Sequence, residues 1–299
     1  MASARGRDDG AEEKSWQELS SDVKKYAATH LNETEETRDN AVAEIKRWIG
    51  ECDDLCEHFG DFLILRFLRI SKFNLEETKN KILKYHKQLI KLPEWYSNWD
   101  PLQPGLEELL NLGVILPLRK PDDQGRLVVI MRSAQHNPNV HAFSDVSKVS
   151  LMGLEIAMKH YPAASVYGCS LFVDSSSATI RHIVQYRPNV LLNMANSWDS
   201  FPFIFQTINI FNVPMFFKTT VKLLRSFMSE ELKTRFHVYS SSETTQECFR
   251  DVPASILPVE YGGTDGTIRK LTKHWKKLIV KNRDWFTSEK NEQIIISNH

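Results

Sequence analysis

The chain has 299 residues, enough for one large domain or two smaller ones. Its composition, 41% hydrophobic and 25% charged, is ordinary for a water-soluble globular protein. Lys plus Arg and Asp plus Glu each number 38, and this zero net charge argues against a dedicated nucleic-acid-binding protein. The charges are unevenly spread, since 33–61 is acidic and 269–290 is basic, so neutrality still allows a local basic patch.

The sequence also gives expectations about location. No apolar run reaches the roughly 18–20 residues that span a bilayer. The opening segment MASARGRDDGAEEK lacks the apolar core of a secretory signal. The four cysteines, Cys52, Cys56, Cys169 and Cys248, have no second cysteine or histidine pair that would complete a zinc site. We therefore expect reduced thiols, no metal or other cofactor, and a cytoplasmic protein.

The first hundred residues predict helices and no strand. Residues 1–30 are polar with little apolar periodicity, so a disordered tail is expected there. A helix is predicted over 33–59, with Asn32 as its N-cap. Two further helical segments follow, at 61–73 and 74–91. Together they predict a helical N-terminal domain over 31–100.

After this region, strands and helices alternate. Pro93, Pro101 and Pro104 interrupt the helical periodicity and mark a boundary. Strands are predicted at 114–118, 126–132, 166–174, 200–211 and 236–240, and helices at 144–160, 179–186, 188–198, 214–228 and 230–235. This alternation indicates an α/β domain with a mostly parallel sheet over 101–266. A basic amphipathic helix and tail are expected at 267–299.

The stretch from Ser200 to Met228 combines a buried strand with an amphipathic helix. Pro214 suits the first helical turn. Beyond it, apolar and basic residues gather on different sides of the helix. Two interpretations compete: a surface helix packed on a core strand, or a hinged lid over an apolar cavity whose basic edge meets an anionic membrane. The pattern alone does not separate them.

Motifs of common catalytic sites do not occur, since the chain has no GxGxxG, Walker A, HExxH or GxSxG sequence. Asp174 is followed by three serines after a predicted strand, but such a segment is far more often a turn than a nucleophile site. His182 and His237 have no sequence-local acid or metal partner. No catalytic residues and no enzyme activity are therefore predicted.

Aromatic and aliphatic residues of the α/β half predict the wall of a ligand pocket. Alternation along a strand places Phe201, Phe203 and Phe205 on one face. Ligand sites are concave and mostly apolar, with few polar groups. In this hypothesis Asn193 orients a ligand hydroxyl, although it equally suits a solvent-facing position. The predicted pocket residues are Phe172, Asn193, Phe201, Phe203, Phe205, Ile208, Ile210, Phe217, Val221 and Leu224.

A series of motifs resembles the CRAL-TRIO lipid-binding family. In chain order they are DFLILRFLR at 61–69, DQGR at 123–126, the spaced Asp174, His182 and Pro188, the segment 199–217, and LPVEYGG at 257–263. Any one of them is weak, whereas the ordered set is specific. The chain looks closest to the branch that contains the tocopherol transfer, retinaldehyde-binding and clavesin proteins.

The resemblance implies a helical N-terminal domain and an α/β lipid pocket closed by a mobile helical lid. It implies a monomeric, peripheral carrier of one hydrophobic molecule, such as a tocopherol, retinoid, carotenoid or similar lipid, without catalysis. Transient contact with anionic membranes is then predicted through the lid and its neighbours, at Phe216, Lys218, Lys222, Arg225, Lys233 and Arg235.

The chain departs from the tocopherol transfer branch at several positions. Ile204, Gln206 and Glu231 stand where that branch has basic residues that contact phosphoinositides. A phosphatidylinositol bisphosphate site is therefore at best partly retained. Ala178 stands where the tocopherol protein has a bulky tryptophan, which implies a different pocket shape. The alternative function is a phosphoinositide-binding membrane-trafficking adaptor.

Overall fold

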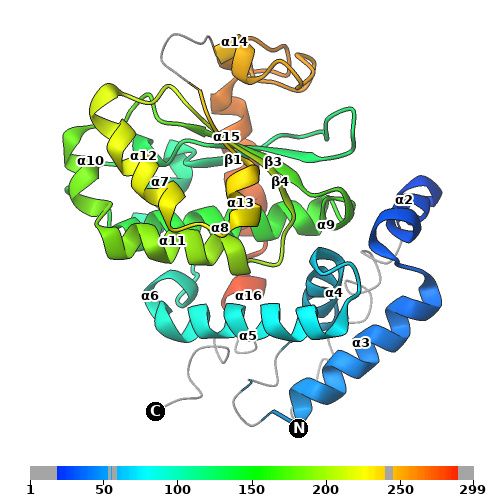
Figure 1. The fold of residues 1–299 in the computed structure, drawn as a ribbon. Coiled ribbons are helices and arrows are strands. Elements are labelled where there is room, and N and C mark those ends of the chain that lie inside the picture. The colour runs from blue at the N-terminus through cyan, green and yellow to red at the C-terminus, as the bar shows by residue number, and fades with distance from the viewer. Residues whose placement is uncertain (1–18, 53–54, 56–58, 240–244, 289–299) are drawn as a thin grey trace, which may run out of the picture.

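The computed structural model describes residues 19–52, 55, 59–239 and 245–288. Figure 1 shows a helical group, α3 to α5, below an α/β unit that contains the sheet. The expectations for 1–18 and 289–299 lie outside the described residues. The N-terminal helices are α2 (Ser21–Leu31), α3 (Glu35–Gly50), α4 (Asp61–Ile70), α5 (Leu75–Lys91) and α6 (Pro93–Tyr96).

The N-terminal helices differ from the sequence prediction at several ends. α3 ends at Gly50 and α4 at Ile70, short of the predicted ends at 59 and 73, and two further differences involve α2 and the start of α3. Residues 21–30, predicted as part of a tail, belong to α2, which buries Val23, Ala27 and Leu31 in a cluster with Val166. That partner lies far away in the sequence, so local polarity gave no sign of it. The predicted helix start is also shifted: Asn32 has a φ of 62° and ends α2, while the Thr34 hydroxyl caps α3.

Five strands form one sheet in the order β1-β2-β3-β4-β5. They are β1 (Ile115–Pro117), β2 (Leu127–Met131), β3 (Cys169–Asp174), β4 (Phe205–Phe211) and β5 (Phe236–Val238). β1 pairs with β2 antiparallel, and the other neighbours pair in parallel. The predicted mostly parallel α/β domain is therefore confirmed.

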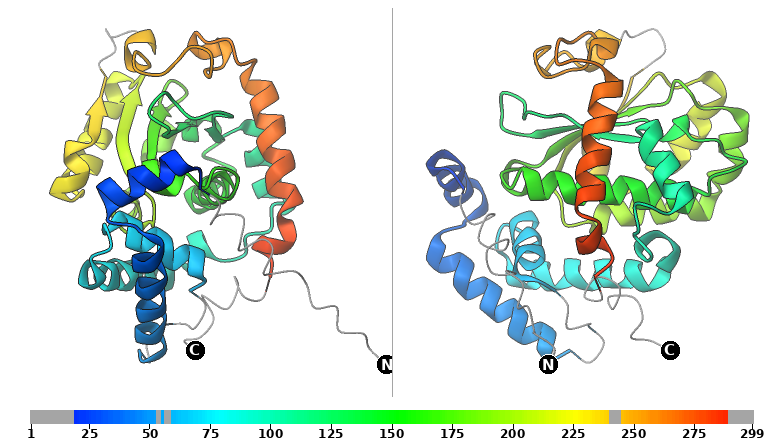
Figure 2. Two further views of the ribbon diagram at one scale, coloured as in Figure 1. Left: turned by 90° about the vertical axis from the view of Figure 1, so that its right-hand side faces the viewer. Right: turned by 180° about the vertical axis from the view of Figure 1, so that it is seen from behind.

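Helices connect the strands and cover the sheet (Figure 2). They are α7 (Pro104–Leu112), η1 (Ser133–Gln135), α8 (Phe143–His160), α9 (Ala164–Tyr167), α10 (Ile180–Gln185), α11 (Pro188–Ser200), η2 (Met215–Phe217), α12 (Lys218–Ser226), α13 (Glu230–Thr234), α14 (Thr245–Cys248), η3 (Val259–Tyr261), α15 (Ile268–Lys281) and α16 (Arg283–Phe286).

The start of β4 is set by a close contact with the end of α9. Gly168 has a φ of 78°, and a Cβ atom there would lie 2.5 Å from the carbonyl oxygen of Ile204. Gln206 is an extra residue in the ladder, because Phe205 pairs with Cys169 and Thr207 with Ser170. A bulge of this kind bends the strand at its first residues.

The C-terminal helix α15 is a structural part of the α/β unit. Its buried residues Leu271, Trp275 and Ile279 recur at helical spacing, and the indole of Trp275 donates to the Pro117 carbonyl of β1. Its basic face stays outward. In Figure 2, α15 runs along one side of the α/β unit toward the helical group.

Candidate functional site

One face of the sheet forms a continuous apolar layer with α8. The register places Ile115, Met131, Val173 and Ile210 side by side across four strands. A Cβ atom on Gly153 of α8 would lie 2.6 Å from the Ile115 side chain, so α8 packs directly on this face. The predicted pocket residues Ile208 and Ile210 therefore belong to this layer, which is called the α8 face below.

Phe172 lies on the opposite face of the sheet. It pairs with Asn209, and successive strand residues point to opposite sides, so Phe172 cannot share a wall with Ile208 and Ile210. Its ring stacks on Phe249 at 4.4 Å between centroids, and Phe249 also meets the ring of Phe211. Phe172 is thus part of the core beneath the C-terminal segment. The sequence prediction lacked the register between strands that separates these residues.

Phe201, Phe203 and Phe205 are all buried but do not alternate along one strand. β4 begins only at Phe205, because α11 runs to Ser200 and a bend follows. The rings of Phe203 and Phe205 meet edge to face at 5.8 Å. The Phe201 ring instead lies under the guanidinium of Arg66, 5.5 Å from its centroid. The expected aromatic wall is therefore a compact corner at the start of β4.

The predicted lid is the pair η2 and α12, which lies along α11 (Figure 1). Its residues Phe217, Val221 and Leu224 are buried. The Phe217 ring meets the ring of Tyr186 at 5.5 Å, and burial raises the pKa of that tyrosine. Asn193 is half-buried on α11. In this structure the apolar stripe of α12 is turned inward.

Polar bonds hold the two ends of α12. Before it, Asn212 donates from Nδ2 to Asp174 Oδ1 at 3.1 Å, and the Tyr261 hydroxyl donates to Asp174 Oδ2 at 2.8 Å. Burial raises the pKa of Tyr261, so its hydroxyl keeps the proton it donates. After α12, the backbone N–H and hydroxyl of Ser229 bond to the Asp199 carboxylate at 3.1 and 2.5 Å.

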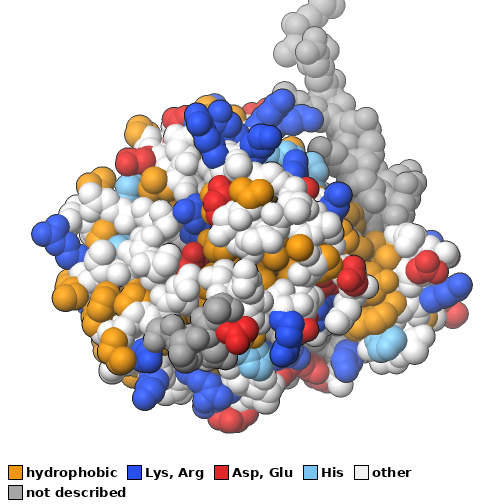
Figure 3. All heavy atoms as spheres, turned by 90° about the horizontal axis from the view of Figure 1, so that it is seen from above, with side chains coloured by type: hydrophobic (Ala, Val, Ile, Leu, Met, Phe, Trp, Pro, Cys, Tyr) orange, Lys and Arg blue, Asp and Glu red, His pale blue; other side chains and the backbone are white. Residues whose placement is uncertain are grey.

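Four exposed apolar residues gather where α10 meets η2. They are Ile180 and Val184 of α10, exposed by 70% and 64%, and Met215 and Phe216 of η2, exposed by 75% and 43%. This apolar patch adjoins basic residues at the start of α12. Figure 3 shows hydrophobic side chains and Lys or Arg side chains together at one side of the molecule. Ile180 and Val184 were missed from the sequence, although their i, i+4 spacing in a short helix was a visible signal.

A basic hollow of about 590 Å³ lies between α12 and α13. Its lining residues are Lys222, Arg225, Ser226, Glu230, Lys233 and Thr234. Lys233 pairs with Glu230 at 2.7 Å. Three of the five basic residues that were predicted to contact a membrane, Lys222, Arg225 and Lys233, therefore line one hollow. Arg235 lies elsewhere, with bonds to Glu231 at 2.8 Å and to the Phe205 carbonyl at 3.1 Å.

Two buried arginines of α4 join the helical domain to the α/β domain. Arg66 bonds to both oxygens of Glu155 on α8, at 2.7 and 3.0 Å, and to the carbonyl of Pro202 at 3.0 Å. Arg69 bonds to both oxygens of Glu33, at 2.8 and 2.7 Å, and also to the Ser165 hydroxyl. This arginine latch was missed, although two arginines within an apolar helix were its signal.

One hydroxyl contact extends this junction toward the lid. Tyr96 of α6 donates to the Ser197 hydroxyl of α11 at 3.2 Å, and burial raises the pKa of Tyr96 to about 12. α5 packs along α11 as well. α11 is therefore a shared element, with the helical domain on one side and α12 on another.

Three other features were sought in the described part of the chain: a metal site, a reactive thiol and a membrane-spanning helix. Within those ranges, no three His, Cys, Asp or Glu side chains are grouped to hold a metal ion. Burial raises the pKa of the Cys169 thiol, which is therefore a poor nucleophile. No helix in the described part of the chain is long and apolar enough to cross a bilayer.

Comparison with known proteins places the chain in a family. Residues 111–263 match the CRAL/TRIO domain, and residues 34–106 match a Pinta-like UBA domain. The first match covers half of the chain, so the protein belongs to the CRAL/TRIO family.

Relatives and one solved structure agree with this assignment. The chain is 25% identical over 273 residues to a Homo sapiens protein named alpha-tocopherol transfer protein-like, covering 91% of this chain and 78% of the relative. It is 27% identical over 247 residues to clavesin-2 of Mus musculus, covering 82% and 75%. The crystal structure of Sfh5 aligns with a TM-score of 0.51 at 15% identity, covering 84% of this chain and 98% of Sfh5, which supports the fold alone.

Proposed function

We propose that this protein binds one small hydrophobic molecule behind α12 and exchanges it at membranes, without catalysis. The observation that carries the proposal is the construction of the lid. Its inward stripe makes apolar contacts, while its polar bonds lie at the two ends. The apolar side chains of the stripe form no hydrogen bonds, so separation on that side breaks none. In the last turn of α12, the Arg225 guanidinium donates to the Lys233 carbonyl of α13 at 3.4 Å.

The ligand side of the proposal rests on the α8 face and the inward stripe of α12. Both present aliphatic and aromatic side chains. Transferring a lipid of several hundred Å² from water to such surroundings yields roughly 10 kcal/mol before binding costs. A ligand held this strongly leaves slowly unless part of the protein opens. The pocket is proposed to include Ile208, Ile210, Phe217, Val221 and Leu224, with Phe203 and Phe205 at its corner.

The membrane side rests on the apolar patch and the basic hollow. Apolar side chains enter the acyl boundary, while basic groups meet anionic head groups, each adding about 1 kcal/mol near such a surface. Because Met215 and Phe216 belong to η2, the patch is continuous with the lid. Contact with a membrane would thus act directly on the element that closes the pocket.

The name of one relative supports a proposal for the ligand class. A tocopherol, retinoid, carotenoid or similar lipid suits an apolar layer of this kind, and transfer appears in the name of one relative. We further propose a cytoplasmic monomer that visits membrane surfaces.

The direct test is the lipid content of the purified protein. Organic extraction followed by mass spectrometry should recover one class of hydrophobic molecule near one per chain. The variant for comparison is Leu224→Asp, which places a charge on the inward stripe and should reduce the amount of lipid recovered. Wild-type protein that stays empty after exposure to several lipid sources would refute the carrier function.

A phosphoinositide-binding adaptor is the second candidate, and the basic hollow is the observation that favours it. Against it, Ile204 and Gln206 supply no positive charge at the start of β4. Liposome flotation with and without phosphatidylinositol bisphosphate separates the two. The carrier function predicts little difference at equal surface charge, whereas strong selectivity would favour the adaptor.

A further inference from the structure

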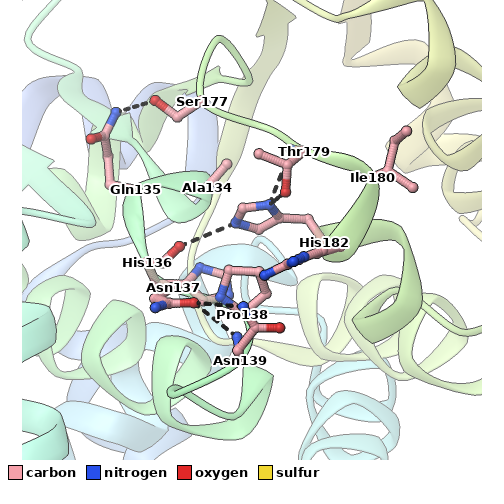
Figure 4. A pocket seen from close by; sticks show the side chains of 11 residues that line it. Ala134, Gln135, His136, Asn137, Pro138, Asn139, Ser177, Thr179, Ile180 and His182 are labelled. Carbon is pink, nitrogen blue, oxygen red and sulfur yellow. Dashed lines mark hydrogen bonds between the residues drawn. The ribbon is translucent and has the colours of Figure 1, made fainter.

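A second cavity, of about 650 Å³, opens beside the apolar patch. It is formed by the loop after η1 and the first residues of α10, and it includes His136, Asn137, Ile180, Arg181 and His182. This cavity is called the histidine groove. Figure 4 shows Gln135 bonded to Ser177 at one end, and His182 between Thr179 and the backbone of His136.

The hydrogen bonds of His182 define a neutral ring. The backbone N–H of Thr179 points at Nδ1 at 3.1 Å, and an N–H only donates, so Nδ1 must be the acceptor. Nε2 faces the His136 carbonyl oxygen at 3.3 Å and carries the proton. Burial, and secondly the neighbouring His136, lower the pKa of His182 below its ordinary value, which agrees with a neutral ring.

The hydrogen-bond partners of His136 differ from those of His182. Its Nδ1 faces the backbone carbonyl of Ser133, and its Nε2 faces Gln185 Oε1 at 2.8 Å. The Gln185 amide cannot be reversed, because its Nε2 already donates to two carbonyls, those of Pro138 and His141. Both ring nitrogens of His136 therefore meet acceptors only. Each ring nitrogen of His136 can bond to the partner it faces only as a donor.

The charged side chain in the described lining of the groove is that of Arg181. Among the residues that line it, all in the described part of the chain, none is Asp or Glu. Glu108 is an acidic residue near the groove but outside its lining, and its carboxylate lies 3.2 Å from Nε2 of His141. Arg181 is exposed, and its side chain has no hydrogen bond or ion pair within the described residues. The Arg181 guanidinium thus lines an open cavity that has no carboxylate in its described lining, a combination that favours an anion.

The position of the groove indicates which anion. Ile180 belongs both to the apolar patch and to the lining of the groove. When the patch lies at the acyl boundary, the groove lies at the level of the lipid head groups. We propose that the histidine groove, with His136 protonated on both ring nitrogens, binds the phosphate of a membrane phospholipid, with Arg181 as its direct ligand. This inference rests on the membrane contact of the proposed function.

The test compares Arg181→Ala with Arg187→Ala. Arg187 is also exposed and lies at the start of α11, outside the groove, so both variants lose one charge. On phosphatidylcholine vesicles that contain phosphatidic acid, Arg181→Ala should lower the partition coefficient about tenfold, and Arg187→Ala by no more than about fivefold. Equal losses in both variants would overturn the proposal, because a general charge effect would then explain the binding.

A second measurement needs no membrane. Histidine ¹⁵N NMR of the full chain should show His136 with both nitrogens protonated and His182 protonated at Nε2 only. Glycerol 3-phosphate should shift the His136 signals in wild type but not in Arg181→Ala, while glycerol at matched ionic strength should not. A neutral His136 ring, or no shift, would overturn the site. If inorganic phosphate fills the groove and phospholipid vesicles do not displace it, the assignment of the site to a lipid would be overturned.

These measurements separate this inference from the carrier function. If extraction recovers a lipid from Arg181→Ala as from wild type while both bind vesicles equally, only the histidine groove fails. If wild type carries no lipid but glycerol 3-phosphate shifts His136, the phosphate site stands and the carrier function fails.

Discussion

The arginine latch and the lid hold the α/β domain in opposite ways. Arg66 and Arg69 are nearly inaccessible, with side chains exposed by 3% and 1%, and each makes two bonds to a carboxylate. The inner side of α12 is instead apolar. A guanidinium that donates two hydrogen bonds to one carboxylate fixes the geometry of the pair, whereas the hydrophobic effect has no preferred direction.

This difference assigns separate mechanical roles to the two contacts. Pulling the latch apart would leave buried charges unpaired, which is costly. Opening α12 against a membrane exchanges one apolar surrounding for another, because acyl chains are as apolar as the protein interior. In the proposed function, the helical domain is therefore the fixed platform and α12 is the part that moves.

The largest expected effect comes from breaking the latch. Arg69→Leu should lower the free energy of unfolding by about 3–5 kcal/mol, because Glu33 then remains buried without its main partner. Urea denaturation measures this change. Arg250→Leu is the control, since Arg250 is 81% exposed and should change stability by less than about 0.5 kcal/mol. A loss below about 1 kcal/mol for Arg69→Leu would show that the latch contributes little.

A smaller effect is expected from Phe217→Asp in the lid. A charge on the inward stripe should disfavour closure by about 2 kcal/mol and so speed ligand release about 30-fold. Stopped-flow transfer of a fluorescent lipid measures the rate. The neighbouring Phe216→Asp should leave release from the closed state unchanged and weaken vesicle binding instead, because Phe216 faces outward. Identical behaviour of the two variants would contradict the assigned sides of the helix.

A drop in pH should destabilise α10, which carries His182, before it affects the arginine latch of α4. The folded-state pKa of His182 lies below its ordinary value of 6.5, through burial first and His136 second. Below that value the unfolded chain binds more protons than the folded chain, so stability present above pH 6.5 is lost as pH falls. The latch arginines do not titrate there. Hydrogen exchange should therefore rise at α10 before α4, and equal protection at both would contradict this.

The smallest effect concerns surface charge on the lid. Lys222→Ala should reduce partition onto anionic vesicles about fivefold, through the loss of about 1 kcal/mol of attraction. Lys87→Ala, on the exposed side of α5, should have little effect, because the platform faces away from the membrane in the proposed orientation. Comparable losses from both lysines would mean that attraction depends on overall charge and not on the lid.

Much of the fold was accessible from the sequence because its signals are local. The strand at 126–132 and the helices at 179–186 and 188–198 differ from the observed elements by no more than two residues at each end. Apolar runs, prolines and turn residues decide these elements within a few positions. The inward side of α12 likewise follows from helical spacing, since Phe217, Val221 and Leu224 are buried together, while the opening of this helix stays a prediction.

The remaining features depend on partners far apart in the chain. Arg66 meets Glu155, 89 positions away, and α2 is held by Val166. The division of Phe172 from Ile210 follows from the register between strands, which alternation within one strand does not specify. The groove around His136 required the direction of each hydrogen bond, which only coordinates reveal.

The two carboxylates beside α12 restrict how this helix can travel. While Asn212 stays bonded to Asp174 and Ser229 to Asp199, the chain is anchored on both sides of α12. A movement that keeps both anchors is a rotation about the long axis of the helix, which would turn the stripe of Val221 and Leu224 outward and carry Lys222 sideways. Spin labels at its two ends would report almost constant spacing to the sheet, while one at its middle would change its surroundings.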